Sequence, residues 1–179
     1  GNTLEFGPSA KAAVSGGSST LYGGHSLKQG TANNNTLILS GEITDTGSSA
    51  QGGASRGAYD ANDNTVTVTK GAKIAAQITG GKSGGGNANG NTVDVQEGAE
   101  FLGHLIYGGR ADNRNTSRSE GDASSNTVTF SGLATGKSLT VWGGFANWGN
   151  ADQNTVTVTE TARISTTFID ADQENNLYA

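Results

Sequence analysis

The repeat that decides the fold is clearest at residues 91–95, which read Asn-Thr-Val-Asp-Val, and at residues 106–109, which read Ile-Tyr-Gly-Gly. Val93 and Val95 alternate with polar residues, which is the period of a strand with one buried face. An Asn followed by large apolar residues at its second and fourth positions occurs six times, at Asn2, Asn35, Asn64, Asn91, Asn126 and Asn154. The copies are 27–35 residues apart, and such periods are typical of solenoids.

A pair of glycines is the second landmark of the repeat, and it occurs in five of the six units, at residues 23–24, 52–53, 80–81, 108–109 and 143–144. A short apolar stretch precedes each pair, and it is weakest in the second unit, where it reads Ala50-Gln51. We expect the glycines to end the last strand of a unit, where the backbone turns sharply. Each unit therefore reads as strand, turn, short strand, strand and long polar loop.

One unit cannot bury a core alone, but stacked units can, because equivalent strands then pair at about 4.8 Å per rung. The sequence predicts an all-β fold, a right-handed parallel β-helix (β-solenoid) of about six rungs of 27–35 residues. We expect residues 1–179 to form a single β-solenoid segment with a loop insertion at 110–125. The repeated Asn should face inward and bind the rungs on both sides through its amide, and the Thr that follows it should face outward.

Composition excludes several classes of protein. The 179 residues carry a net charge of −5 at pH 7, which argues against a nucleic-acid partner. The absence of Cys excludes a disulfide scaffold and thiolate metal sites. No apolar stretch is long enough for a membrane-spanning helix. The chain opens with Gly1 and has no signal peptide, so we expect it to be a fragment of a longer chain.

The repeat resembles the passenger-domain repeats of Gram-negative type V autotransporter adhesins. The clearest matches are residues 91–95 with 106–109, and Asn-Thr-Val-Thr-Phe at 126–130 with Val-Trp-Gly-Gly at 141–144. The resemblance extends over the whole chain and implies a β-helical stalk that serves adhesion or virulence. It implies an extracellular location, secreted or on the bacterial cell surface, with the parent chain attached to the outer membrane. The implied partner is a host-cell protein or glycan, or another bacterial surface.

The residue pattern does not predict an enzyme. The acidic residues are scattered, and neither His25 nor His104 has an obvious Ser, Cys or Asp partner, so we expect no catalytic residue, no metal site and no cofactor. His104 should be a wall residue of the strand that contains Leu105. A β-helical carbohydrate-active enzyme fragment stays as the alternative, and three or more carboxylates within about 10 Å in one groove would favour it.

Aromatic residues provide the candidate binding site. Tyr22, Tyr107 and Trp142 each precede a glycine pair and have the parity opposite to the inward apolar residue, so they should face outward. Phe145 and Trp148 follow the fifth pair. Outward aromatic rings pack well on sugar rings and on hydrophobic spots of other proteins. The predicted ligand-binding residues are Trp142, Phe145, Trp148, Tyr107 and Tyr22.

Overall fold

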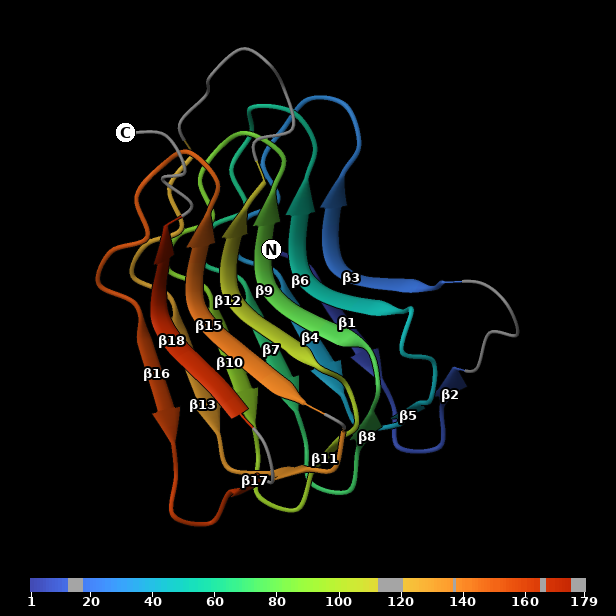
Figure 1. Ribbon diagram of the computed structural model, residues 1–179. Coiled ribbons are helices and arrows are strands. Elements are labelled where there is room, and N and C mark those ends of the chain that lie inside the picture. Colours follow the sequence, from blue (N-terminus) through green and yellow to red (C-terminus); the bar gives the residue numbers. More distant parts are fainter. Residues whose placement is uncertain (13–17, 113–120, 137, 165–166, 175–179) are drawn as a thin grey trace.

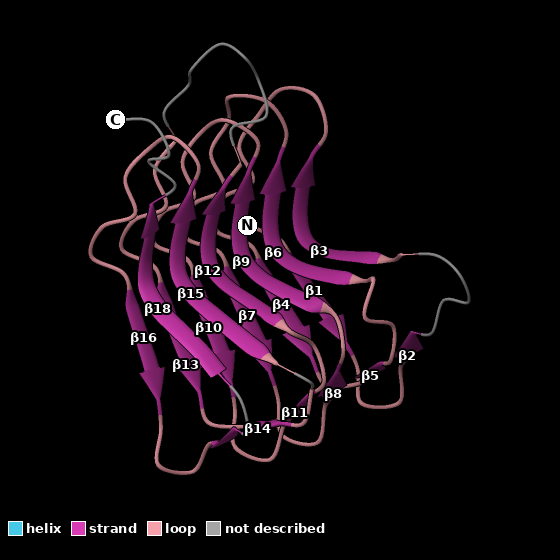
Figure 2. Ribbon diagram, viewed as in Figure 1, coloured by secondary structure: helices cyan, strands magenta, loops and turns pink. Residues whose placement is uncertain are grey.

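The computed structural model describes residues 1–179 except 13–17, 113–120, 137, 165–166 and 175–179 (Figure 1). The regular elements of the described ranges are all β-strands, joined by turns and loops (Figure 2). No helix in these ranges could span a membrane. The strands form three parallel sheets of six strands each, and every unit contributes one strand to each sheet. The chain is therefore a parallel β-solenoid, as the repeat predicted, and its stacked strands make about five turns where about six rungs were expected.

Sheet A contains the four-residue strands that follow the repeated Asn: β1 (Thr3–Phe6), β4 (Thr36–Leu39), β7 (Thr65–Val68), β10 (Thr92–Val95), β13 (Thr127–Phe130) and β16 (Thr155–Val158). Sheet B contains the two-residue strands β2 (Lys11–Ala12), β5 (Glu42–Ile43), β8 (Lys73–Ile74), β11 (Glu100–Phe101), β14 (Leu133–Ala134) and β17 (Arg163–Ile164). Sheet C contains the long strands β3 (Thr20–Ser26), β6 (Ser49–Ser55), β9 (Gln77–Ser83), β12 (Leu105–Ala111), β15 (Leu139–Ala146) and β18 (Thr167–Glu174).

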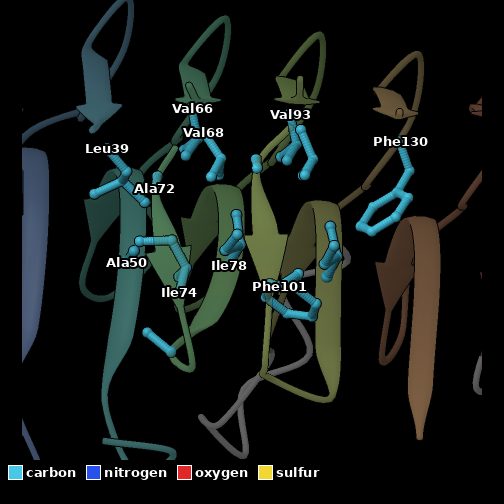
Figure 3. Close-up of a cluster of buried hydrophobic side chains, with 14 of the residues drawn as sticks. Leu39, Ala50, Val66, Val68, Ala72, Ile74, Ile78, Val93, Phe101 and Phe130 are labelled. Carbon is cyan, nitrogen blue, oxygen red and sulfur yellow. The ribbon is translucent and has the colours of Figure 1, made fainter. Parts of the chain in front are cut away.

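The register places equivalent residues of successive units directly beside one another. Val93 pairs with Val66 on one side and with Val128 on the other, without an offset. All three valines are fully buried. Side chains of sheet A thus meet those of sheets B and C in one continuous core (Figure 3), where Phe101 and Phe130 pack edge to face with ring centroids 6.5 Å apart. The core is a set of apolar columns that run along the axis.

The repeated Asn residues form a buried amide ladder, as predicted. Each of the first five Asn residues donates two hydrogen bonds to the Oδ1 of the next Asn along the chain, one from its backbone N–H and one from Nδ2, over 2.9–3.2 Å. Asn64, Asn91 and Asn126 are fully buried. Because a buried amide without partners would cost free energy, this ladder satisfies the polar groups at the corner before sheet A.

The expectation that the glycine pair ends the last strand was wrong, because the pairs lie inside the strands of sheet C. Gly80 and Gly81, for example, lie within β9. Neither has a positive φ, so backbone freedom is not the reason for glycine. A Cβ on Gly81 would overlap the amide of Asn91 and the carbonyl oxygen of Ala61. The pair is required because the Asn ladder and the neighbouring backbone fill the space of the missing side chains.

The long polar loop of each unit ends in an ordered corner that the sequence did not reveal. In five units, the Ala that lies four residues before the start of the sheet A strand is buried. These residues are Ala32, Ala61, Ala88, Ala123 and Ala151. Side-chain oxygens on both sides of this Ala accept backbone N–H groups of a neighbouring rung, as Asp60 does from Asn87 over 2.8 Å. The corner ends on a residue with φ near 60°, such as Asp63.

The insertion predicted at 110–125 is shorter in the structure. Arg110 and Ala111 belong to β12, and Asp112 is buried. At the other end, Ala123 donates a backbone hydrogen bond to Asn150 over 2.8 Å, so this end stacks on the next rung. Residues 113–120 lie outside the described ranges.

Candidate functional site

The outer face of sheet C is the candidate binding surface. Its strands curve along their length (Figure 1), and the two residues that flank a glycine pair lie close together on the outer face. In β3 these residues are Tyr22 and His25, whose rings stack with centroids 4.1 Å apart. The register turns the flanking residues into two columns along the axis. The column before the pair contains Tyr22, Gln51, Thr79, Tyr107 and Trp142, and the column after it contains His25, Ala54, Lys82, Arg110 and Phe145.

Three rings from β12 and β15 form what we call the aromatic cluster: Tyr107, Trp142 and Phe145. The ring centroid of Trp142 lies 4.7 Å from that of Tyr107 and 5.4 Å from that of Phe145. Phe145 also meets Tyr107 edge to face at 5.8 Å. The guanidinium of Arg110 lies 5.0 Å from the centre of the Tyr107 ring and 5.7 Å from that of Phe145, within the range of cation–π attraction.

Exposure differs strongly among the five residues predicted to bind a ligand. Tyr107 is on the outer face but only 4% exposed, because Trp142 and Phe145 pack over it. Burial raises the pKa of Tyr107, Asp112 raises it further, and Arg110 acts in the opposite direction. Trp142, Phe145 and Tyr22 are half-buried, and Trp148, in the loop after β15, is 49% exposed.

Two buried polar atoms of this face have no hydrogen-bond partner among the described residues: Oδ2 of Asp112, which forms an ion pair with Lys82 at 3.5 Å, and the indole nitrogen of Trp142. Indole N–H groups usually find an acceptor when they are buried. Because this nitrogen is not exposed to solvent, it does not contribute to the outer surface of the cluster.

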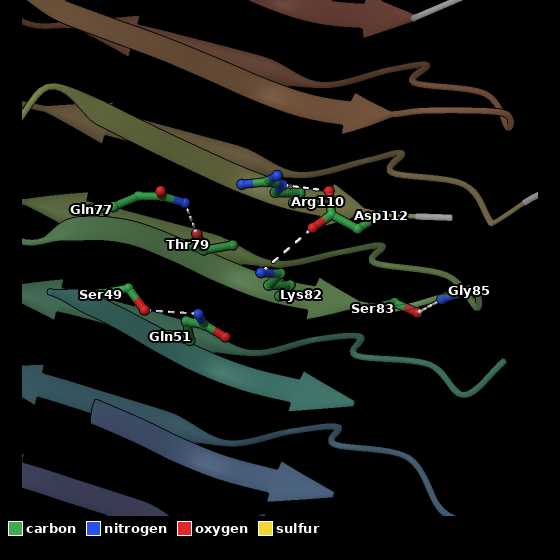
Figure 4. Close-up of polar contacts among 9 residues, drawn as sticks. All are labelled: Ser49, Gln51, Gln77, Thr79, Lys82, Ser83, Gly85, Arg110 and Asp112. Carbon is green, nitrogen blue, oxygen red and sulfur yellow. Dashed lines mark hydrogen bonds and ion pairs between the residues drawn. The ribbon is translucent and has the colours of Figure 1, made fainter. Parts of the chain in front are cut away.

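A network of three charged residues, Lys82, Arg110 and Asp112, lies beside the aromatic cluster (Figure 4). Lys82 and Arg110 belong to the column that follows the glycine pairs. Asp112, 2% exposed, accepts a hydrogen bond from Nε of Arg110 at 2.6 Å, and Nζ of Lys82 lies 3.5 Å from its other carboxylate oxygen. The contact among these three residues was not predicted from the sequence. Their signal was present, since Lys82 and Arg110 both follow a glycine pair directly.

A groove of about 580 Å³ extends from this ion-pair network along the outer face of sheet C. Its lining includes Tyr22 and His25 from β3, Gln51 and Ala54 from β6, and Lys82 from β9. The groove thus crosses successive rungs and follows the solenoid axis. We call it the sheet C groove.

A second groove, of about 790 Å³, lies beside sheet B. It contains two carboxylates, Glu42 and Glu100, which pair with Lys11 at 3.2 Å and with Lys73 at 3.4 Å. His104 also lines it and is exposed. His104 precedes β12, so its expected place in a strand wall was wrong. Across the described ranges, no group of three or more His, Cys, Asp or Glu residues is arranged to hold a metal ion.

The chain matches no protein-family model, no curated protein and no solved structure.

Proposed function

We propose that this chain is a structural segment of a surface-displayed or secreted bacterial adhesin of the autotransporter type. In this role the solenoid is a rigid spacer that carries binding residues on the outer face of sheet C. The resemblance of the Asn and Gly-Gly repeats to autotransporter passengers supports the class, and the stacked rungs suit a rod. The partner would be a glycan or a protein on a host cell, or another bacterial surface.

The aromatic cluster is the observation that carries the binding role. Tyr107, Trp142 and Phe145 lie outside the core, on a sheet face, with centroids 4.7–5.8 Å apart. Trp148 adds a 49% exposed indole in the following loop. Aromatic faces stack on the apolar faces of sugars. The favoured ligand is therefore a sugar or a polar–aromatic protein surface.

The test is a glycan array combined with an adhesion assay on epithelial cells. We expect the Trp142→Ala/Trp148→Ala double variant to lose binding that the wild type shows. The control is Leu27→Ala/Leu133→Ala, which truncates two other exposed apolar residues, 61% and 41% exposed, and should bind like the wild type. Unchanged binding by the tryptophan variant, or no binding by the wild type, would overturn the role of the cluster.

Location needs its own experiment, because the binding assay does not address it. Antibodies against the chain should label intact cells that produce the parent protein, and external protease should remove that labelling. Labelling that requires permeabilised cells would contradict the proposed display outside the cell.

The alternative, a carbohydrate-active enzyme fragment, is favoured only by the groove beside sheet B. That groove holds the pair Glu42 and Glu100, and paired carboxylates are the usual catalysts of glycoside hydrolysis. Each carboxylate forms an ion pair with a lysine side chain of the neighbouring rung. Release of reducing sugar from a polysaccharide panel, abolished in Glu42→Gln/Glu100→Gln, would favour the enzyme over the binding role.

A further inference from the structure

The sheet C groove carries positive charge in a chain that is acidic overall. Arg56 lines it and is exposed, and Lys82 lines it half-buried. The acidic residue in its lining is Asp112, which is almost fully buried and lies within 4 Å of both Arg110 and Lys82. The whole chain has a net charge of −5. The groove is therefore a local basic surface, although the net charge of the chain is negative.

The groove also has the lining expected for a carbohydrate. The stacked rings of Tyr22 and His25, with an interplanar angle of 16°, form one wall. Gln51 and Ala54 belong to the lining, and their small exposure of 6% and 5% places them at its floor. Nε2 of Gln51 donates to Oγ of Ser49 at 2.9 Å, which fixes the amide (Figure 4). Aromatic walls with a few oriented polar groups are typical of sugar-binding sites.

The shape of the groove indicates an extended ligand. Its lining residues come from β3, β6 and β9 and from Asp112, directly after β12. Neighbouring strands are about 4.8 Å apart, so these four rungs cover roughly 15 Å along the axis. That length suits several linked rings in a row and exceeds what one small anion would occupy.

We infer that the sheet C groove binds an anionic oligosaccharide, with carboxylates or sulfates on successive sugar rings. The Arg56 guanidinium is suited to bind such an oxyanion through two parallel hydrogen bonds, and Lys82 provides a second positive charge one rung further along. Tyr22, which lies one rung before Arg56, stacks on a sugar ring at that end of the row. This inference rests on the proposed binding role of sheet C, names its ligand class, and uses residues outside the aromatic cluster.

The test is isothermal titration calorimetry with two anionic probes, hexagalacturonate and a heparin hexasaccharide, and one neutral probe, the fully methyl-esterified hexagalacturonate. We expect at least one anionic probe to bind, with an affinity that falls as salt rises. The neutral ester should bind about tenfold more weakly than hexagalacturonate or not at all. Arg56→Gln and Tyr22→Ala should each weaken anionic binding about tenfold.

Matched controls separate this inference from the proposed function. Lys70→Gln removes one exposed positive charge outside the groove and should leave binding unchanged. Trp142→Ala/Trp148→Ala should also retain binding of the anionic probe, even if it loses cell adhesion. Three outcomes would overturn the inference: no binding of either anionic probe, equal binding of the neutral ester, or full binding by Arg56→Gln with an unchanged melting temperature. None of them would affect the adhesion result, which tests the proposed function separately.

Discussion

Gly81 and Asn91 interlock: the second glycine of the pair in β9 faces the amide of the Asn that begins the next rung. The Oδ1 of Asn91 occupies the place where a Cβ on Gly81 would lie. The same relation joins Gly53 to Asn64 and Gly109 to Asn126. The two landmarks of the repeat are therefore one structural unit, in which the strand of sheet C curves around the amide ladder.

We expect Gly81→Ala to destabilise the fold by about 3 kcal/mol or more, because the methyl group would displace both Asn91 and the backbone of Ala61. The measurement is chemical denaturation followed by circular dichroism. Gly7→Ala is the control, since a Cβ there meets nothing within 4 Å, and it should stay within about 0.5 kcal/mol of the wild type. Equal stability of the two variants would show that the Asn ladder can shift to accommodate the methyl group at little cost in free energy.

Asn91→Ala tests the ladder from the other side. The change removes the acceptor of two hydrogen bonds from Asn64 and the Nδ2 donor to Asn126. Because the groups left behind are buried, we expect a loss of about 2–3 kcal/mol. Asn147→Ala, a half-buried Asn in the loop after β15, is the control. A denaturation midpoint that does not move in Asn91→Ala would mean that water replaces the amide.

The sequence predicted the parts of the fold that repeat and missed those that depend on neighbouring rungs. The alternation of apolar and polar residues predicts that Val66 and Val93 face inward. Asn91 is two residues before Val93, so the same alternation predicts that its amide faces inward. The reason for Gly81 could not be read in this way, because it depends on which atoms lie opposite in the next rung. Equally, Tyr107 has outward parity, yet its neighbours in β15 cover it.

The site was predicted less completely than the fold. Trp142 and Phe145 do meet on one face with Tyr107. The pairing of Lys82 with Asp112 was missed, since it joins residues of different rungs whose contact requires the register. Periodicity indicates a column, and only the packed structure shows which members of the column touch.

A charge inside the core provides a direct test of the inward face. Val68 is fully buried, so Val68→Asp should cost about 4 kcal/mol or more in the free energy of unfolding. Thr65→Asp is the outward-facing control, because Thr65 lies between Thr36 and Thr92 on the neighbouring strands. Thr67 also faces outward, but it pairs with Asp94, so an Asp at position 67 would add repulsion between like charges. Thr65→Asp should change stability by less than about 1 kcal/mol, and a comparable loss in both variants would contradict the assigned faces.

The pH dependence of the sheet C groove should follow His25. Burial lowers the pKa of His25, and the nearby Arg56 lowers it further. The folded pKa is thus below the unfolded value of about 6.5, and the neutral ring is favoured. The contribution of His25 to stability is therefore present above pH 6.5 and is lost as the pH falls through that value toward the lower folded pKa.

Proton NMR titration of the His25 ring measures this directly, and His104→Gln removes the signal of the other histidine. Arg56→Gln should move the pKa of His25 upward only in part, because burial is the larger cause. A pKa at or above the ordinary value in the wild type would contradict the arrangement of His25 and Arg56 in the groove.

The boundaries of the insertion after β12 provide the last prediction. Ala111 and Ala123 are fully buried and pack in one cluster with Ala146 and Ala151, and the backbone N–H of Asp112 donates to Ser83 over 2.8 Å. Deleting residues 111–124 would remove two members of this cluster together with the ladder bonds at both ends. We therefore expect that deletion to lower the melting temperature by about 10 °C.

Replacing only residues 113–120 with a short Gly-Ser linker keeps all of these contacts, so it should change the melting temperature by no more than about 2 °C, because loop length has a small entropic effect. Circular dichroism melting of the two variants beside the wild type makes the comparison. Similar melting of both deletions would show that the alanine cluster adds little to stability. A large loss in the shorter deletion would show that residues 113–120 themselves stabilise the neighbouring rungs.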